Sequence, residues 1–375
     1  MRIVDIKLTP VSYPAPTTLR WGRGARDTVG GIIVQILTDE GITGLGEFEA
    51  SYPLARATVE HRILPLLRGE NPLNVERLWA TMHAALRGEP RQMLGGLDVA
   101  LWDLLGKACG QPIYRLLGAY QDRIMVYIAP SMKQPEVIAE ECAQFRAEGH
   151  RAIKLRIGLG QVGLAEPGDM KKDFQVVEGA RHALGDDFII GVDTDRTYDH
   201  FMALKMAKRL HELGAAWFEE PLQATGNEQY IRAMQRLNGL IEVPLSGGQG
   251  FSTRFEFGNL IAQQAVDIVQ PDCVGCGGIT ELRRIAALAS VWHLGFMPHV
   301  SCGCGYDIRV VATLHVLASL PDPLYLCYPA YDTPLRTELF QEQPKVVEGY
   351  LSVPQKPGLG IELNEEALAR FQVDE

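Results

Sequence analysis

Short apolar runs of strand length alternate with longer amphipathic helical segments from about Arg123 onward. One helical segment shows the pattern clearly, because Phe201, Leu204 and Leu210 fall on one helical face and Gly214 follows. Repeated strand and helix units give parallel strands, and eight such strands can close into a β/α barrel. The sequence predicts eight strands, at 124–128, 152–156, 188–192, 215–218, 241–245, 266–269, 295–298 and 324–327.

The residues before about Arg123 do not show this alternation of strands and helices. Residues 3–11 alternate apolar and polar side chains, and residues 32–37 lead through Asp39-Glu40-Gly41 into 42–46, which is a hairpin pattern. Helical spacing follows, first around Trp79 and then around Leu101. We expect a small α+β unit here. The turn-rich tail after Val347 is expected to return to this unit.

Composition excludes several classes of partner. The formal net charge is −10 and no long basic stretch occurs, which disfavours nucleic acid and anionic membrane surfaces. No apolar run approaches the roughly 18 residues of a membrane helix. The first residues lack the pattern of a signal peptide, and seven cysteines suit a reducing compartment, so we expect a cytoplasmic protein.

Oxygen-bearing side chains follow three neighbouring predicted strands. Asp193 ends the third strand, Glu219 ends the fourth, and Gln249 follows the fifth. A barrel brings the carboxyl ends of its strands together. Carboxylate and carboxamide oxygens are ligands that Mg²⁺ accepts, and its remaining positions stay open for water or substrate. The sequence therefore predicts a magnesium site with these three ligands.

Acid-base residues occupy other strand ends. Lys154 and Arg156 end the second strand and point to the same side. Asp272 ends the sixth strand and His299 the seventh, and a carboxylate that orients an imidazole also supports its protonated form. A structural alternative for Arg156 is an ion pair with Asp193.

Four motifs carry a resemblance that covers nearly the whole chain: GGLDVALWDLLGKACGQPIYRLLG, WFEEP, VDIVQPD and GCGGITE. They resemble the mandelate racemase and muconate lactonizing enzyme branch of the enolase superfamily. The resemblance implies a (β/α)7β TIM-like barrel at 123–345 and an α+β capping domain at 1–122, completed by the tail at 346–375. It also implies lid loops around residues 18–26 and 50–53.

The same resemblance implies a chemistry. Such enzymes use Mg²⁺ to remove the proton beside a carboxylate, which gives an ene-diolate, and no organic cofactor is implied. Carried over by position, the metal ligands are Asp193, Glu219 and Gln249. The catalytic candidates are Lys154, Arg156, Asp272 and His299.

Two departures from the family pattern narrow the reaction. Gln249 stands where a Glu or Asp ligand is usual, so one ligand charge is missing. Arg156 stands where a lysine base is usual, and a guanidinium is a poor base at neutral pH. With His299 as the clear base, we expect an acid-sugar dehydratase, a hydro-lyase that forms a 2-keto-3-deoxy acid. We also expect a homo-oligomer.

Alternatives stay open. A cycloisomerase, epimerase or racemase would use the same intermediate, and a catalytically degenerate binding protein would explain both departures. A zinc site is a further alternative, because Cys273 and Cys276 follow one strand while Cys302 and Cys304 follow the next. Gly-rich turns with buried cysteines explain that spacing equally well.

Overall fold

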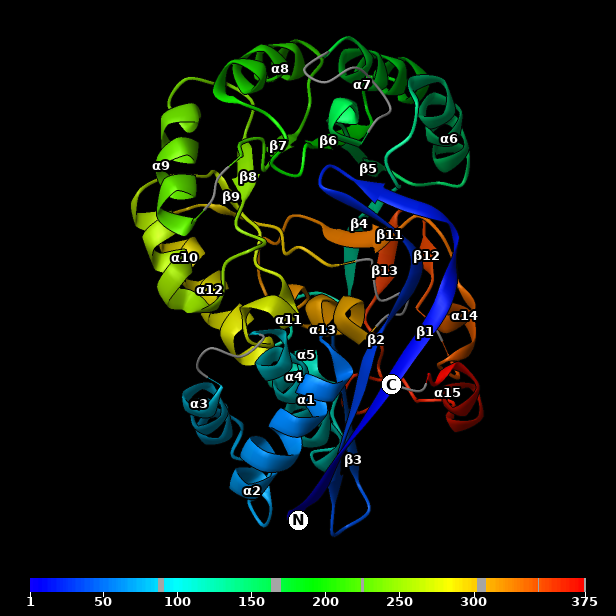
Figure 1. The fold of residues 1–375 in the computed structure, drawn as a ribbon, viewed down its shortest axis with the longest axis vertical. Helices are drawn as coiled ribbons and strands as arrows, with labels where there is room; N and C mark the ends of the chain where they lie inside the picture. The colour runs from blue at the N-terminus through cyan, green and yellow to red at the C-terminus, as the bar shows by residue number, and fades with distance from the viewer. Residues whose placement is uncertain (87–90, 163–169, 224–225, 302–307, 343, 374–375) are drawn as a thin grey trace.

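The computed structural model describes residues 1–86, 91–162, 170–223, 226–301, 308–342 and 344–373 of the chain. Figure 1 shows a ring of helices around a parallel sheet, with a second α+β part, here called the cap, packed against it. The long β1–β2 ribbon runs from the cap to the barrel in this view (Figure 1). The predicted fold class, a β/α barrel with a capping domain, is confirmed.

The cap begins with a three-stranded antiparallel sheet in the order β1-β2-β3, formed by β1 (Ile3–Trp21), β2 (Gly24–Thr38) and β3 (Thr43–Phe48). Helix α4 packs on β3 so closely that a Cβ on Gly46 would lie 2.0 Å from the Gly96 carbonyl oxygen. Glycine is therefore needed at this contact. The cap helices are α1 (Tyr52–Thr58), η1 (Val59–Ile63), α2 (Leu64–Leu67), α3 (Val75–Ala85), α4 (Arg91–Ala108) and α5 (Ile113–Leu116).

Eight parallel strands form the barrel sheet, in sequence order from β4 to β11. They are β4 (Arg123–Ala129), β5 (Ala152–Arg156), β6 (Ile189–Asp193), β7 (Trp217–Glu219), β8 (Leu245–Gly247), β9 (Ile268–Val269), β10 (Gly295–Phe296) and β11 (Leu326–Pro329). The helices of this part are α6 (Pro135–Ala147), η2 (Leu159–Val162), α7 (Lys171–Leu184), α8 (His200–Glu212), α9 (Asn227–Asn238), α10 (Thr253–Ala262), α11 (Cys273–Cys276), α12 (Ile279–Val291), α13 (Ile308–Leu317) and α14 (Pro334–Glu338).

The strand ladder does not close completely. β11 pairs with β4, but no ladder joins β10 to β11 within the described ranges. A backbone hydrogen bond between described residues crosses this gap, from Leu324 N to Phe296 O at 3.0 Å. The sheet is thus a barrel with one loosely joined seam.

All eight predicted barrel strands occur, with one clear difference in position. The fifth was predicted at 241–245, whereas β8 begins at Leu245. Pro244 has no N–H group to give to a neighbouring strand, so regular pairing starts after it. The predicted lid loop at 18–26 is instead the tip of the β1–β2 hairpin.

Two buried carboxylates of α4 join the parts of the fold. Asp98 accepts hydrogen bonds from Thr280 N and Oγ1, at 2.9 and 2.7 Å, in the first turn of α12. Asp103 accepts from Leu45 N in β3 and from Leu359 N in the tail, each at 2.8 Å. One cap helix therefore fastens a barrel helix, the cap sheet and the tail.

The tail first lies on the barrel and then on the cap. β12 (Val346–Val347) and β13 (Tyr350–Ser352) form a hairpin, and β13 pairs antiparallel with β4. Farther along, α15 (Glu365–Phe371) is followed by a bridge between Val11 and Gln372. The predicted division at 122/123 and 345/346 into separate domains stays a prediction.

None of the helices in the described part of the chain combines the length and the apolarity that crossing a membrane would require.

Candidate active site

The register of the barrel sheet brings predicted site residues from separate strands to one level. Arg156 at the end of β5 neighbours Asp193 at the end of β6, and Asp193 neighbours Glu219 at the end of β7. Asp272 and His299 form a parallel bridge just beyond β9 and β10. These residues are far apart in the sequence, and the carboxyl ends of the strands gather them.

Asp193 and Glu219 converge on the ammonium group of Lys154. Lys154 Nζ lies 2.6 Å from Glu219 Oε1 and 3.1 Å from Asp193 Oδ2, and all three side chains are buried. Trp217 Nε1 and Gln270 Nε2 donate to the other Glu219 oxygen at 3.2 and 2.7 Å. Glu219 is therefore held in one orientation.

Electrostatics separate the roles of these groups. Burial works to lower the pKa of Lys154, but the carboxylates of Asp193 and Glu219 outweigh it, and the pKa rises above its ordinary value. Burial opposes ionisation of Asp193, yet Lys154 and Arg156 lower its pKa overall. At Glu219 burial prevails and the pKa is raised. Lys154, Asp193 and Glu219 therefore form one buried network of a cation between two carboxyl groups.

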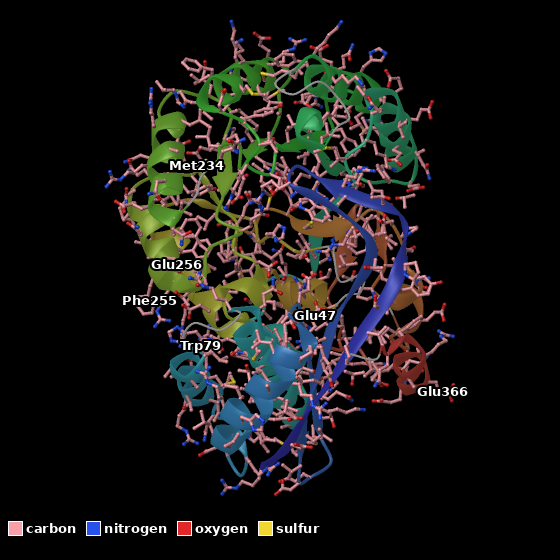
Figure 2. The ribbon with its side chains drawn as sticks, in the orientation of Figure 1. Glu47, Trp79, Met234, Phe255, Glu256 and Glu366 are labelled. Atoms are coloured by element: carbon pink, nitrogen blue, oxygen red, sulfur yellow. The ribbon has the colours of Figure 1, made fainter. Side chains whose placement is uncertain are left out.

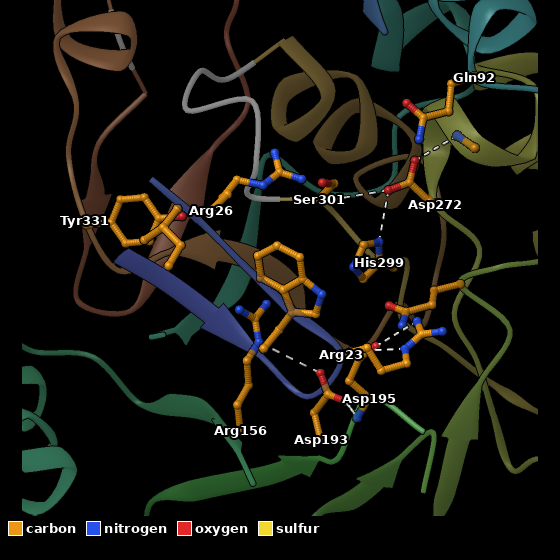
Figure 3. Close-up of a pocket in the computed structure, with 14 residues that line it drawn as sticks. Arg23, Arg26, Gln92, Arg156, Asp193, Asp195, Asp272, His299, Ser301 and Tyr331 are labelled. Atoms are coloured by element: carbon orange, nitrogen blue, oxygen red, sulfur yellow. Dashed lines mark hydrogen bonds and ion pairs between the residues drawn. The ribbon is translucent and has the colours of Figure 1, made fainter. Parts of the chain in front are cut away.

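The position of Arg156 is compatible with both roles that the sequence left open. Its Nε lies 4.0 Å from Asp193 Oδ2, so the ion pair exists, and its side chain also lines the central cavity (Figure 3). A guanidinium in this place can bind a substrate carboxylate without changing its own protonation.

Gln249 lines the same cavity but is turned toward Glu220. Its Nε2 donates to Glu220 Oε2 at 3.1 Å. Glu220 is fully buried and paired with Arg196 at 2.5 and 2.8 Å, so it serves as a structural anion. Gln249 Oε1 is then the amide atom suited to a cation.

The donor set fits a hard divalent cation with an amide as third ligand. No group of three His, Cys, Asp or Glu side chains in the described ranges could hold a metal ion by itself. Asp193 and Glu219 nevertheless converge on one cationic atom, Lys154 Nζ, and Gln249 borders the same cavity as Asp193. Carboxylate and carboxamide oxygens are the chemistry that Mg²⁺ takes.

His299 and Asp272 form a hydrogen-bonded pair. His299 Nδ1 lies 3.0 Å from Asp272 Oδ2, and Gly275 N donates to Asp272 Oδ1 at 2.8 Å. Burial raises the pKa of Asp272, but the His299 contact and the Arg309 charge lower it to about 2. Burial lowers the pKa of His299, and Asp272 more than reverses this. Because Asp272 engages Nδ1, Nε2 is the nitrogen that can accept a substrate proton.

A cavity of about 330 Å³ joins these groups, which suits a small substrate. Figure 3 shows side chains from the barrel and from the cap pointing into it. The barrel contributes Arg156, Asp193, Asp195, Gln249, Asp272, Gly275, His299, Ser301 and Tyr331, and the cap contributes Leu19, Trp21, Arg23, Arg26 and Gln92.

The hairpin tip brings two arginines that the sequence did not single out. Arg23 contacts Asp195 at 3.0 and 3.2 Å, and Arg26 contacts Glu49 at 3.1 Å. The predicted lid stretch at 18–26 was the available signal, since it contains both. The other predicted lid, at 50–53, does not border this cavity in the part of the chain described.

The cysteines give no support to a zinc site. Cys273 and Cys276 are buried, and burial raises the pKa of both thiols well above its ordinary value, which disfavours the thiolate that zinc needs. Cys302 and Cys304 lie outside the described residues.

Comparison with known proteins gives matches along most of the chain. The mandelate racemase / muconate lactonizing enzyme N-terminal domain matches residues 4–118, and the enolase C-terminal domain-like model matches residues 137–367. The chain is 32% identical over 352 residues to an arabinonate dehydratase of Saccharolobus solfataricus, covering 91% of this chain and 90% of that one.

Two further relatives extend the comparison. A D-galactarolactone cycloisomerase of Agrobacterium fabrum is 31% identical over 362 residues, covering 91% of each chain. A racemase from Streptomyces coelicolor, solved with bound magnesium, superimposes with a TM-score of 0.87 at 26% identity, over 99% of this chain and 100% of that one. The chain belongs to the mandelate racemase/muconate lactonizing enzyme family of the enolase superfamily.

Proposed function

We propose that this protein is a Mg²⁺-dependent acid-sugar dehydratase. The observation that carries the proposal is that the His299–Asp272 pair, Asp193 and Arg156 border one cavity. That combination suits removal of a proton beside a carboxylate. The likeness to an arabinonate dehydratase supports an aldonate or aldarate as substrate class.

Asp193, Glu219 and Gln249 would hold the metal through two carboxylates and one carboxamide oxygen. When bound, Mg²⁺ would neutralise the negative charge that develops on the substrate carboxylate as the adjacent proton leaves. Gln249 brings no charge, so the site would bind the metal less tightly than a site of three carboxylates and leave more positive charge facing the substrate.

Cations of the chain itself surround the place of the substrate carboxylate. Lys154 stays protonated between Asp193 and Glu219, and Arg156 faces the cavity. Arg156 can stabilise negative charge on substrate oxygens through charge-assisted hydrogen bonds, and Lys154 can do so as a buried positive charge nearby. The hairpin arginines Arg23 and Arg26 can bind hydroxyl or carboxylate groups farther along the sugar.

His299 would move the protons. In its neutral form Nε2 takes the proton from C2, and the electron pair of that C–H bond spreads into the carboxylate to give an ene-diolate. The imidazolium, stabilised by Asp272, then gives its proton to the C3 hydroxyl, which leaves as water. The enol that forms tautomerises to a 2-keto-3-deoxy acid.

A cycloisomerase is a second candidate, because the galactarolactone cycloisomerase relative is as similar as the dehydratase. Opening a lactone ring requires the same proton removal, followed by cleavage of the bond between the next carbon and the ring oxygen, which stays on the molecule as a carboxylate oxygen instead of leaving as water. Both reactions would use His299 in its first step.

Incubation with a panel of aldonates, aldarates and their lactones in Mg²⁺ tests the proposal. Formation of a 2-keto acid with release of water supports the dehydratase, and a ring-opened 2-keto acid with the mass of the lactone supports the cycloisomerase. Exchange of the C2 proton in D₂O without either product indicates epimerisation or racemisation. No exchange, no product and no Mg²⁺ binding would together indicate the catalytically degenerate binding protein.

A further inference from the structure

Arg309 is a buried arginine that the proposed chemistry does not use. It lies in the first turn of α13, is 1% exposed, and is among the largest fully buried side chains in the described structure. A buried cation is costly unless anions compensate it, so its partners indicate its role.

Its partners come from both parts of the fold. From the cap, Glu47 Oε1 accepts from Arg309 Nε at 2.8 Å and from its backbone N at 2.9 Å, and Glu49 Oε2 lies 3.6 Å from Nη1. From the barrel, Asp272 Oδ2 lies 3.9 Å from the same Nη1. Figure 2 shows Glu47 where the cap meets the barrel.

Asp272 Oδ2 is the atom on which these contacts converge. It accepts from His299 Nδ1 at 3.0 Å and from Ser301 N at 3.3 Å, and Arg309 Nη1 lies 3.9 Å from it. Ser301 Oγ also donates to Glu49 of the cap at 3.2 Å, so Ser301 connects the cap to the same Asp272 carboxylate.

We infer that Arg309 is a positioning residue for the His299–Asp272 pair, which it ties to cap strand β3 through Glu47. Its positive charge keeps Asp272 ionised as the acceptor for His299 Nδ1 and limits how strongly that carboxylate holds the imidazole proton. Glu47 alone would satisfy the need for a structural ion pair. The approach of the guanidinium to Asp272 is what the structural role leaves unexplained.

Several groups bear on the charge of the pair, from different elements. They are Arg309 in α13, Lys154 in β5, Cys327 in β11 and Glu49 of the cap, which accepts from Ser301, while the Cys273 thiol in α11 lies close enough to Asp272 to be affected by its charge. Arg309 is the cation nearest to Asp272 among them. Removing its charge should make Asp272 a stronger acceptor and hold the proton on His299 more tightly.

An imidazole NMR titration tests the inference without any substrate. In the full-length protein with Mg²⁺ present, one of the nine histidine signals is assigned to His299 by its loss in His299→Asn. Glu47→Gln is compared with Glu47→Gln/Arg309→Met, because the double variant leaves no unpaired charge at Glu47. A screened unit charge several ångströms away shifts a pKa by roughly 0.5–1.5 units, so the double variant should titrate higher by that amount.

Two further variants separate charge from structure. Arg309→Lys keeps the charge and should titrate close to the wild type. Lys107→Met takes the cation from another buried carboxylate, Asp103, and should lower stability without moving the His299 titration. The inference would be refuted if His299 had the same pKa in Glu47→Gln and in the double variant. It would also be refuted if Lys107→Met shifted the pKa of His299 as much as the double variant does.

The consequence for catalysis rests on the proposed function. If the wild type exchanges the C2 proton of an acid sugar, the acidic limb of the pH–rate profile of the double variant should move to higher pH by as much as the pKa of His299 rises. A shifted titration in a protein that turns over no acid sugar would refute the proposed function and leave the positioning role standing. An unshifted His299 titration in an enzyme that turns over an acid sugar would refute the positioning role and leave the proposed function standing.

Discussion

Gln249→Glu is the change that most directly examines the proposed metal site. It supplies the third carboxylate that Gln249 lacks, and it replaces the amide nitrogen 3.1 Å from Glu220 Oε2 with a negative oxygen. One substitution therefore strengthens the donor set for a cation and also introduces repulsion inside the protein. The two effects have opposite signs and are measured separately.

The size of each effect follows from the contacts. Two like charges at such a distance repel by roughly 5 kcal/mol at an effective dielectric constant of about 20. Arg196, at 2.5 and 2.8 Å from the Glu220 oxygens, offsets part of this repulsion. We expect the metal-free variant to be less stable by about 1–3 kcal/mol, which lowers Tm by roughly 2–6 °C. Added ligand charge should tighten Mg²⁺ binding roughly 10- to 100-fold.

Isothermal titration calorimetry measures the Kd for Mg²⁺, and thermal unfolding with and without Mg²⁺ measures the stability. Gln249→Met, which removes the amide oxygen, should weaken binding. Gln235→Glu, which adds the same charge on the exposed face of α9, should change neither quantity much. A Kd that stays the same or weakens in Gln249→Glu would refute the assignment of Gln249 as a ligand.

Three further predictions concern single side chains. His299→Asn should reduce C2 proton exchange and turnover roughly 10²- to 10⁴-fold while calorimetry finds Mg²⁺ binding unchanged, and exchange at the wild-type rate would exclude His299 as the base. Asp272→Asn should lower the pKa of His299, since Asp272 raises it, so the acidic limb of the rate profile should move to lower pH; an upward movement would contradict the role of the pair. Burial raises the pKa of Asp98 to about 7, so its contribution to stability is complete below about pH 4 and is lost as pH rises toward 7. Urea unfolding at pH 5 and pH 8 should therefore show a smaller loss in Asp98→Asn than in the wild type, by about 2–4 kcal/mol, and equal losses would count against a raised pKa.

Much of the fold and of the candidate site was predictable because both follow the strand rhythm. Asp193, Glu219, Asp272 and His299 stand where apolar runs end, and a parallel barrel brings such ends together whatever the details of packing. The same pattern predicted the fifth strand too early in the sequence. The alternation of apolar runs does not take account of Pro244, which lacks the backbone N–H that a regular strand pairing needs.

The contribution of the cap was only partly predictable, because the resemblance indicated a lid at 18–26 but not which of its side chains reach the cavity. Arg23 and Arg26 reach the cavity through a long hairpin whose tip meets Asp195 and Glu49, and no periodic pattern relates residues so far apart. Arg309 looks like an ordinary helical residue until Glu47 and Asp272 are seen beside it. The orientation of Gln249 likewise depends on Glu220, which only the folded chain brings within reach.

The contacts of the Asp103 carboxylate have consequences for folding during synthesis and for moving the cap from one relative to another. Its two oxygens accept from Leu45 in β3 and from Leu359, which is 256 positions farther along the chain than Asp103. A ribosome delivers Asp103 long before Leu359, so the cap must wait in an unfinished state while the whole barrel is synthesised. Transplanting a cap between relatives would for the same reason require moving the N-terminal segment and the tail together.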